Sequence, residues 1–320
     1  MLCCQRTLHT AYGGSTMTAY LLLALSILLE TAKNVFSNDF SKRMLVNDTD
    51  IYKFNVFMYT GSFLVLCLFG AGSCSAFTVG TAFLFALAIW LNQYCFLKAL
   101  KAGSLSFTTF IQGVALIIPL IYGAFVWKET ILPRQFFLLA VLIGGMALAL
   151  LGGHEQPEAI TARPKNTGSG RFLLYAGGAM LFLGCICILQ STHQMSEHSD
   201  ELVPFLRLAF LFTVLMNLIT WCLREALWRR HSGYGEHATF SLKSGAIPIA
   251  AASGIFMGLV HMINLYLAGV LPKVIFFPVS NGGLIFVSLI AALIFFKERM
   301  SVRQWVGILI GTVALSLIGL

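Results

Sequence analysis

The sequence has few charged residues. Only 11% of its 320 residues are Asp, Glu, Lys or Arg, whereas 58% are hydrophobic and the mean hydropathy is +0.83. A soluble domain is typically about 25% charged and about 45–50% apolar. A chain with so little charge lacks the polar side chains needed to cover a globule of this size. The composition therefore excludes a soluble enzyme, a nucleic-acid-binding domain and a disordered protein, and it predicts an all-α polytopic membrane protein.

Nucleotide and metal motifs are also missing. The chain has no Gly-rich loop ending in Gly-Lys-Ser or Gly-Lys-Thr, the loop that holds ATP phosphates. Its eight cysteines show no metal-ligand spacing, and most lie in apolar runs, where a free Cys behaves as a small hydrophobe. We therefore expect no cofactor. The net charge of +8 fits basic loops on one side of a membrane better than nucleic-acid binding.

Ten apolar runs are long enough to cross a bilayer, which takes about 20 residues per helix. Short connections with charged residues, Gly or Pro separate them. A polar tail at 1–16 precedes the first run, so Met17 is a candidate true start, and a linker loop is expected at 153–170. The expected spans cover residues 17–37, 53–71, 77–98, 104–126, 134–152, 171–192, 203–223, 244–268, 274–296 and 302–320.

The second half of the chain repeats the first. An offset of 169 residues aligns Gln112 with Asn281, each followed by Gly. Further on it aligns Lys128-Glu129 with Lys297-Glu298 and Arg134-Gln135 with Arg303-Gln304. The repeats cover 17–152 and 171–320, with five spans each. Because five is odd, the second repeat enters the membrane from the opposite side. Such inverted repeats are typical of secondary transporters, whose site lies between the repeats. A duplicated structural membrane protein without a transport role is the alternative.

These repeated residues resemble the drug/metabolite transporter superfamily, in particular its ten-helix EamA-like members. The pattern of that family is a long apolar helix, a Glu at the following turn, a Gln at the start of the next helix, and then glycines. Here it consists of Glu129, Gln135, Gly144 and Gly145 in the first half and of Glu298, Gln304, Gly307 and Gly311 in the second. The resemblance extends over nearly the whole chain from Met17. It implies a carrier of small organic molecules driven by ion or substrate gradients.

The motif residues themselves are interpreted as structural. Glu129 and Glu298 lie at membrane ends, where a carboxylate can cap the next helix by accepting its unpaired N–H groups. Two pairs of glycines have four-residue spacing, which lets membrane helices approach closely. They are Gly254 with Gly258 and Gly307 with Gly311.

Polar residues inside the spans are the candidate substrate-binding residues. An ionisable residue deep in a membrane helix is costly and therefore suggests function. Glu30 lies in the first span, with Lys33 and Asn34 one turn further on the same face. Glu30 either recognises a cationic or amine-bearing substrate, carries a proton, or is merely neutralised by Lys33.

Further candidates lie in the later spans. His261 is midway along the eighth span with Asn264 on the same face, and it is either a proton relay or a packing residue. Gln112 and Asn281 are favoured by the repeat symmetry, and Asn92 and Gln190 are weaker additions. Two interpretations are open for Trp90, Tyr94, Phe110, Phe276 and Phe277: they form an aromatic wall, or they face lipid or pack the bundle, as most of the 27 Phe must.

Two other functions stay open. An exchanger of nucleotide-sugars or phosphorylated metabolites, from a related branch of the superfamily, would need two or more Arg or Lys at the cavity. An integral-membrane enzyme would need a polar cluster near one surface, and the single candidate is His193, Glu197, His198, Asp200 and Glu201.

The expected setting is the inner membrane of a bacterium. The partners are a small-molecule substrate and the lipid bilayer, with no nucleic acid; H+ or another coupling ion and a homodimer are left open. With ten spans, fifteen Lys and Arg fall on one side of the membrane and five on the other. Because basic loops stay in the cytoplasm, this bias predicts that both termini face outward.

Overall fold

The computed structural model describes residues 16–69, 72–115, 117–126, 133–151, 169–231, 245–271, 273–298 and 301–318. These residues form helices and no strand. The helices are α2 (Thr16–Asp39), the π-helix η1 (Phe40–Met44), α3 (Asp48–Cys67), α4 (Ala76–Ala102), α5 (Leu105–Val114), α6 (Ile117–Phe125), α7 (Pro133–Leu151), α8 (Ser169–Gln194), the 3-10 helix η3 (Ser199–Glu201), α9 (Leu202–His231), α10 (Ala246–Val270), α11 (Lys273–Phe296) and α12 (Val302–Ile318). The expected tail before Thr16 and the linker before Ser169 lie outside the described residues.

Helices occupy the position of every expected span. Seven helical stretches of the described chain, some of which run over two of these helices, are long and apolar enough to cross a membrane: Met17–Met44, Ala76–Ala102, Leu105–Gly123, Gly170–Gln194, Ser199–Trp228, Ala246–Asn264 and Val279–Phe296. Pro133–Ala149 and Val302–Ala314 are apolar but shorter. α3 is less apolar because its first two turns carry Asp48, Asp50 and Lys53. The chain is therefore an all-helical integral membrane protein.

The fourth expected span, 104–126, is divided into two helices. α5 ends at Val114 and α6 begins at Ile117. Pro119 explains this difference, because proline has no N–H and its ring clashes with the carbonyl four residues earlier, that of Ala115. The division places Gln112 in the last turn of α5.

The seventh expected span differs at its end. It was expected to stop at 223, but α9 continues to His231. The beginning of the basic stretch that follows 223 is therefore helical and not part of a loop.

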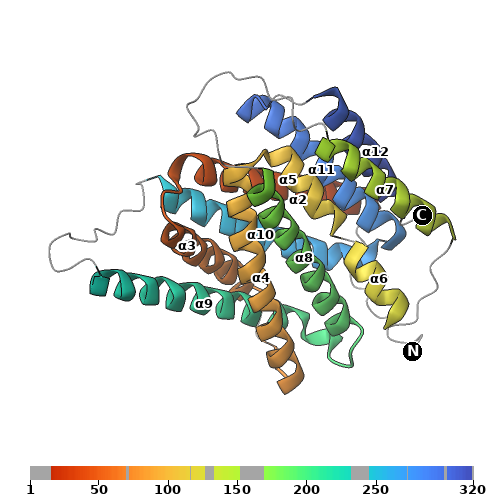
Figure 1. Cartoon of the computed structure of the whole chain (residues 1–320). Helices are drawn as coiled ribbons and strands as arrows, with labels where there is room; N and C mark the ends of the chain where they lie inside the picture. The colour runs from red at the N-terminus through yellow and green to blue at the C-terminus, as the bar shows by residue number, and fades with distance from the viewer. Residues whose placement is uncertain are drawn as a thin grey trace.

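α3 and α9 pack against each other and run antiparallel at one side of the bundle (Figure 1). The Asn55 side-chain amide donates to Asn217 Oδ1 at 3.2 Å, and both residues are fully buried. One turn further along α3, the ring of Tyr59 stacks on Phe210 at 5.9 Å between centroids. Because α9 residue numbers fall as α3 numbers rise, the two helices have opposite directions.

α7 and α12 lie side by side at the other side of the bundle (Figure 1). A Cβ on Gly307 would lie 2.5 Å from the Gly145 carbonyl oxygen and 2.6 Å from the Ala149 nitrogen. A Cβ on Gly145 would lie 3.2 Å from the Gly311 Cα. Gly307 thus lies near both Gly145 and Ala149, whereas Gly311, further along α12, lies near Gly145. Residue numbers fall along α7 as they rise along α12, so these two helices are also antiparallel. The expectation that Gly307 and Gly311 form a packing seam is confirmed.

The second glycine pair forms a seam between α10 and α3. A Cβ on Gly254 would lie 1.9 Å from the Met58 carbonyl oxygen, and one on Gly258 would lie 2.8 Å from Val65 Cβ. The expectation for this pair is confirmed as well. Here the residue numbers of both helices rise together, so α3 and α10 run in the same direction.

The remaining helices lie between these two sides. α2 packs on α10 and α11, and α8 packs on α4, α5 and α6. Buried hydrophobic side chains form one cluster drawn mainly from α3, α4, α9 and α10 and another drawn mainly from α5, α7, α11 and α12. α2 and α8 thus join the two parts of the bundle, and the cavity described below lies among these helices.

Each end of the bundle brings distant turns together. At one end, the Lys42 ammonium of η1 donates to the Gly103 carbonyl, and Glu298 accepts from Leu105. We call this end the η1 face. At the opposite end, Glu201 accepts hydrogen bonds from the Ser75 N–H and hydroxyl groups at 2.9 and 2.8 Å. Turns expected on the same side of the membrane therefore meet.

Candidate functional site

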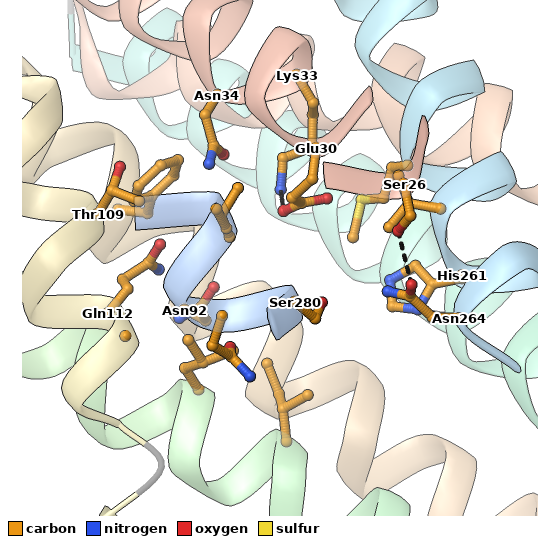
Figure 2. Close-up of a pocket in the computed structure, with 18 of the residues that line it drawn as sticks. Ser26, Glu30, Lys33, Asn34, Asn92, Thr109, Gln112, His261, Asn264 and Ser280 are labelled. Atoms are coloured by element: carbon orange, nitrogen blue, oxygen red, sulfur yellow. Dashed lines mark hydrogen bonds and ion pairs between the residues drawn. The ribbon is translucent and has the colours of Figure 1, made fainter. Parts of the chain in front are cut away.

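A cavity of about 240 Å³ lies among α2, α3, α4, α5, α8, α10 and α11. Seven of the eight polar residues that the sequence singled out for substrate binding line its wall: Glu30, Asn34, Asn92, Gln112, His261, Asn264 and Asn281. Gln190 of α8 does not. Figure 2, which labels all of these lining residues except Asn281, shows that their side chains come from helices of both halves of the chain and gather around the same space. The lining helices correspond to the first, third, fourth, sixth, eighth and ninth expected spans, and α3 adds Tyr59.

α2 supplies the two oppositely charged side chains of the wall. Lys33 Nζ donates to Glu30 Oε1 at 2.5 Å. The Lys33 side chain is 10% exposed and that of Glu30 is 23% exposed. The spacing of three residues places both on one helix face, and the low-dielectric surroundings strengthen their attraction. Each charge neutralises the other, as one sequence interpretation held, and yet both remain on the cavity wall.

α2 and α10 meet through a hydrogen bond at another part of the wall. The Ser26 hydroxyl donates to Asn264 Oδ1 at 2.6 Å (Figure 2). His261 lies one turn earlier on α10, and its ring makes an edge contact with Phe210 at 5.3 Å between centroids. His261 thus packs against α9 and also lines the cavity.

Unpaired polar atoms lie at the part of the cavity near α5. Asn34 and Thr109 are each 2% exposed, and neither Asn34 Oδ1 nor Thr109 Oγ1 has a hydrogen-bond partner among the described residues. Figure 2 shows Asn34, Thr109 and Gln112 on the same side of the space. Because buried polar atoms normally have partners, these two atoms are available to bind a polar molecule or water.

The amides of α4 and α11 have different surroundings. Asn92 Nδ2 donates to the Ala179 carbonyl at 2.7 Å, so this side chain joins α4 to α8 as well as lining the cavity. Asn281 and its neighbour Ser280 line the wall from α11. Asn92 is therefore committed in part to helix packing, which agrees with its weaker rank in the sequence.

Sequence reasoning missed several wall residues. Ser280 and Thr109 are short polar residues inside apolar runs, and only their position beside Asn281 and Gln112 could have indicated them. Among the described side chains, the Tyr and Phe residues of the wall are Tyr59, Phe85 and Phe96.

The interpretation as an aromatic wall is wrong for three of its members. Trp90 and Tyr94 stack on Tyr52 instead, at 6.2 and 6.0 Å between centroids. Phe110 is fully buried in the core against Gly311. These residues lie on helices that line the cavity, but on other faces of them. The side chains of Phe276 and Phe277 lie outside the described residues.

The repeated Glu of the second half is a helix cap, but not of the helix that follows it. Glu298 Oε1 accepts from the Leu105 N–H at 2.7 Å, and Oε2 accepts from the Ser106 hydroxyl at 2.8 Å. Lys297 has a positive φ of 49°, which ends α11 in the left-handed conformation and directs the chain across to α5. The expectation that Glu298 caps the next helix is therefore wrong. Glu129 lies outside the described residues.

α12 has its own cap. The Gln304 side chain accepts from the Ser301 N–H at 3.0 Å, and Ser301 Oγ accepts from the Gln304 N–H at 3.3 Å. This reciprocal pair is a capping box. It explains why the motif Gln stands at the start of the helix.

The polar cluster considered for an enzyme is used in packing. His193 is fully buried between the rings of Phe77 and Phe205, and its Nε2 forms a hydrogen bond with Thr78 Oγ1 at 3.0 Å. Glu201 caps α4 through Ser75. Across the described part of the chain, no group of three or more His, Cys, Asp or Glu is arranged to hold a metal ion.

Comparisons with known proteins add little. No family model and no curated protein matches the chain. Among solved structures 28 chains match. One of them, described as "Crystal structure of protein", is 12% identical, covers 91% of this chain and 97% of its own, and has a TM-score of 0.47. This likeness is too distant to support a family or a function.

Proposed function

We propose that the chain is a secondary transporter of the drug/metabolite type, which moves a small organic molecule across the membrane by alternating access. The observation that carries this proposal is the cavity, because residues of both halves line it and it combines polar and apolar groups. Ligand sites of secondary transporters lie at such a position between repeats.

The proposal includes ten crossings built as two inverted five-helix repeats. The helix contacts support it. In two such repeats, α2, α3, α4 and α7 correspond to α8, α9, α10 and α12, and α5 with α6 corresponds to α11. The contacts between helices keep their pattern when each helix is replaced by the one that corresponds to it. α2 on α10 corresponds to α8 on α4, and α3 on α10 corresponds to α9 on α4. The pairs α3–α9, α5–α11 and α7–α12 each map onto themselves, as helices next to a two-fold axis do. α3 and α9, like α7 and α12, are antiparallel, which an inverted relation requires.

The wall chemistry supports an organic, polar and partly apolar substrate. Amide and hydroxyl groups can bind its polar atoms, while Ile89, Leu183 and Met257 can contact its apolar body. Alternating access would expose this site to each side in turn, through rocking of one half against the other. The inner membrane of a bacterium and the outward termini remain part of this proposal.

An exchanger of phosphorylated metabolites is less well supported. Within the described part of the chain, Lys33 is the one Lys or Arg on the cavity wall, and Glu30 neutralises it. Phosphate recognition needs cationic donors whose charge is available, commonly bidentate Arg.

The test begins with the purified full-length chain. Its thermal stability is measured with a panel of cationic, anionic, zwitterionic and neutral solutes, and each solute that raises the Tm is then assayed for uptake into liposomes. We expect uptake into liposomes that contain the chain and none into empty ones. A bound solute that is chemically converted but not moved would support an enzyme, and binding with neither movement nor conversion would refute transport.

A further inference from the structure

A row of buried polar side chains continues from the cavity along α2. Its members are Thr31, Asn34, Ser37, Asn38 and Ser41, each at most 5% exposed. At about 100° per residue, all five fall within roughly a third of the circumference of the helix. We call this row the polar stripe.

The polar atoms of the stripe have no partners. Thr31 Oγ1, Asn34 Oδ1, the oxygens of Ser37 and Ser41, and both polar atoms of Asn38 form no hydrogen bond with any described residue. Apolar packing alone would not favour such groups, because a buried polar atom without a partner is unfavourable. The stripe therefore needs another function.

Several other buried hydroxyls of the bundle behave differently. Thr213 donates to the Ala209 carbonyl at 2.8 Å, Ser253 to Ile249 at 2.8 Å, and Thr108 to Ser104 at 2.7 Å. Each of these bonds returns to the same helix and satisfies the hydroxyl within apolar surroundings. The Thr and Ser hydroxyls of the stripe do not form this bond to their own helix. They therefore differ in hydrogen bonding from the hydroxyls just named.

Neighbouring helices carry matching groups. α2 packs on α5 and α11. Thr109 of α5 and Ser288 of α11 are buried, and their hydroxyl oxygens likewise lack a partner within the described structure. Unpaired polar atoms thus occur on three helices that contact one another, and two of these residues, Asn34 and Thr109, line the same cavity.

The stripe has a direction. Asn34 lines the cavity, and Ser41 lies in η1, about 15 Å from Thr31 along a helix that rises 1.5 Å per residue. That length is roughly half of the hydrocarbon core. The stripe therefore connects the cavity with the η1 face.

The η1 face is closed by specific contacts. Phe40 and Phe54 are fully buried and stack at 4.0 Å between ring centroids. Lys42 bonds to the Gly103 carbonyl, and Lys101 donates to the Leu45 carbonyl at 2.9 Å. These contacts attach η1 to the end of α4. η1 is a π-helix, a form often found at functional sites.

We propose that the polar stripe is one wall of a water-filled path from the cavity to the η1 face, closed here by η1 and opened when the site faces that side. This inference rests on the proposed function and assigns the route by which the polar solute enters or leaves. Water and the solute would supply the hydrogen bonds that the stripe lacks in the closed state.

The test measures water access directly. Ser37→Cys and Ser41→Cys place thiols on the stripe, and Ala32→Cys places one on the same helix about half a turn away. The full-length variants, in membrane vesicles of both orientations, react with a charged, membrane-impermeant methanethiosulfonate, and wild-type protein gives the background of the native cysteines. Only a hydrated thiol forms the reactive thiolate, so we expect the stripe thiols to react roughly tenfold faster than Ala32→Cys, and only from the η1 face.

Equal rates for the stripe and Ala32→Cys would overturn the path, and so would faster reaction from the opposite face alone. If Ser41→Cys does not reach the membrane, Thr31→Cys takes its place in the comparison. The labelling needs no solute. If the stripe is labelled fast but no solute is transported, the proposed function is overturned and the water-filled path stands. If a solute is transported but the stripe is unreactive, the path is overturned and the proposed function stands.

Discussion

Glu298 accepts a hydrogen bond from the Leu105 N–H at 2.7 Å, although 193 positions separate the two residues. The bond joins the turn after α11 to the start of α5 and so holds the second half of the chain to the first at the η1 face.

Glu298→Ala should destabilise the protein. It leaves the first N–H groups of α5 without an acceptor, and loss of a helix cap costs about 1–2 kcal/mol. A lower Tm in detergent checks this. Glu197→Ala is the control, because Glu197 is exposed, and it should change stability by less than about 0.5 kcal/mol. An unchanged Tm for Glu298→Ala would show that the cap is not needed.

Gly307→Ala should separate α7 from α12. Its Cβ would lie 2.5 Å from the Gly145 carbonyl oxygen, so the helices must move apart, at a cost of about 1–3 kcal/mol. Gly144→Ala is the matched control in α7, because nothing lies within 4 Å of its Cβ. That variant should be neutral or up to about 1 kcal/mol more stable, since Ala favours helix. Equal Tm values for the two variants would contradict the close approach.

The ion pair on the cavity wall can be tested with a double-mutant cycle. Lys33→Met or Glu30→Gln alone leaves one charge unpaired. Each should lower stability by about 2–3 kcal/mol, less than for a fully buried pair because Glu30 is 23% exposed. The double variant should be more stable than either single variant. Additive losses, measured by thermal unfolding, would show that the two charges are independent.

The sequence predicted the helices and the site better than the details of the helix ends. Polar residues such as Gln112 and Asn281 are conspicuous in apolar runs, and all of those named from the sequence except Gln190 lie on the cavity wall. Such residues avoid lipid, so the shared interior is their natural place. This reasoning needs no knowledge of contacts.

Features that depend on distant contacts were missed. The partner of Glu298 was misassigned, because a capping carboxylate can serve any helix end within reach and only the fold brings Leu105 there. Aromatic residues were also misplaced. Tyr94 belongs to a cluster with Tyr52, since aromatic side chains pack equally well in a core and at a cavity. The division before α6 did have a sequence signal in Pro119.

Thr109→Val should weaken solute binding without unfolding the protein. It removes a hydroxyl that has no partner in the described structure, and losing one hydrogen bond to the solute costs about 1 kcal/mol, or roughly a fivefold rise in KM. Thr108→Val is the control, because its hydroxyl bonds to the Ser104 carbonyl of its own helix. KM values for uptake, with the Tm of each variant, check this. An equal rise in KM for both variants would contradict direct contact.

Uptake into liposomes by cavity variants tests the transporter most directly. Gln112→Ala and Asn281→Ala remove amides that the two halves contribute to the same wall. Two variants serve as comparisons. Glu129→Gln changes a residue that the sequence predicts at a membrane end, and Thr81→Ala removes a hydroxyl that bonds to the Phe77 carbonyl at 2.8 Å. The assay uses a solute that binds wild-type protein. We predict that both amide variants lose most of their uptake while keeping a wild-type Tm, and that the two comparison variants keep their uptake. Full uptake by Gln112→Ala and Asn281→Ala would contradict a transport site in this cavity.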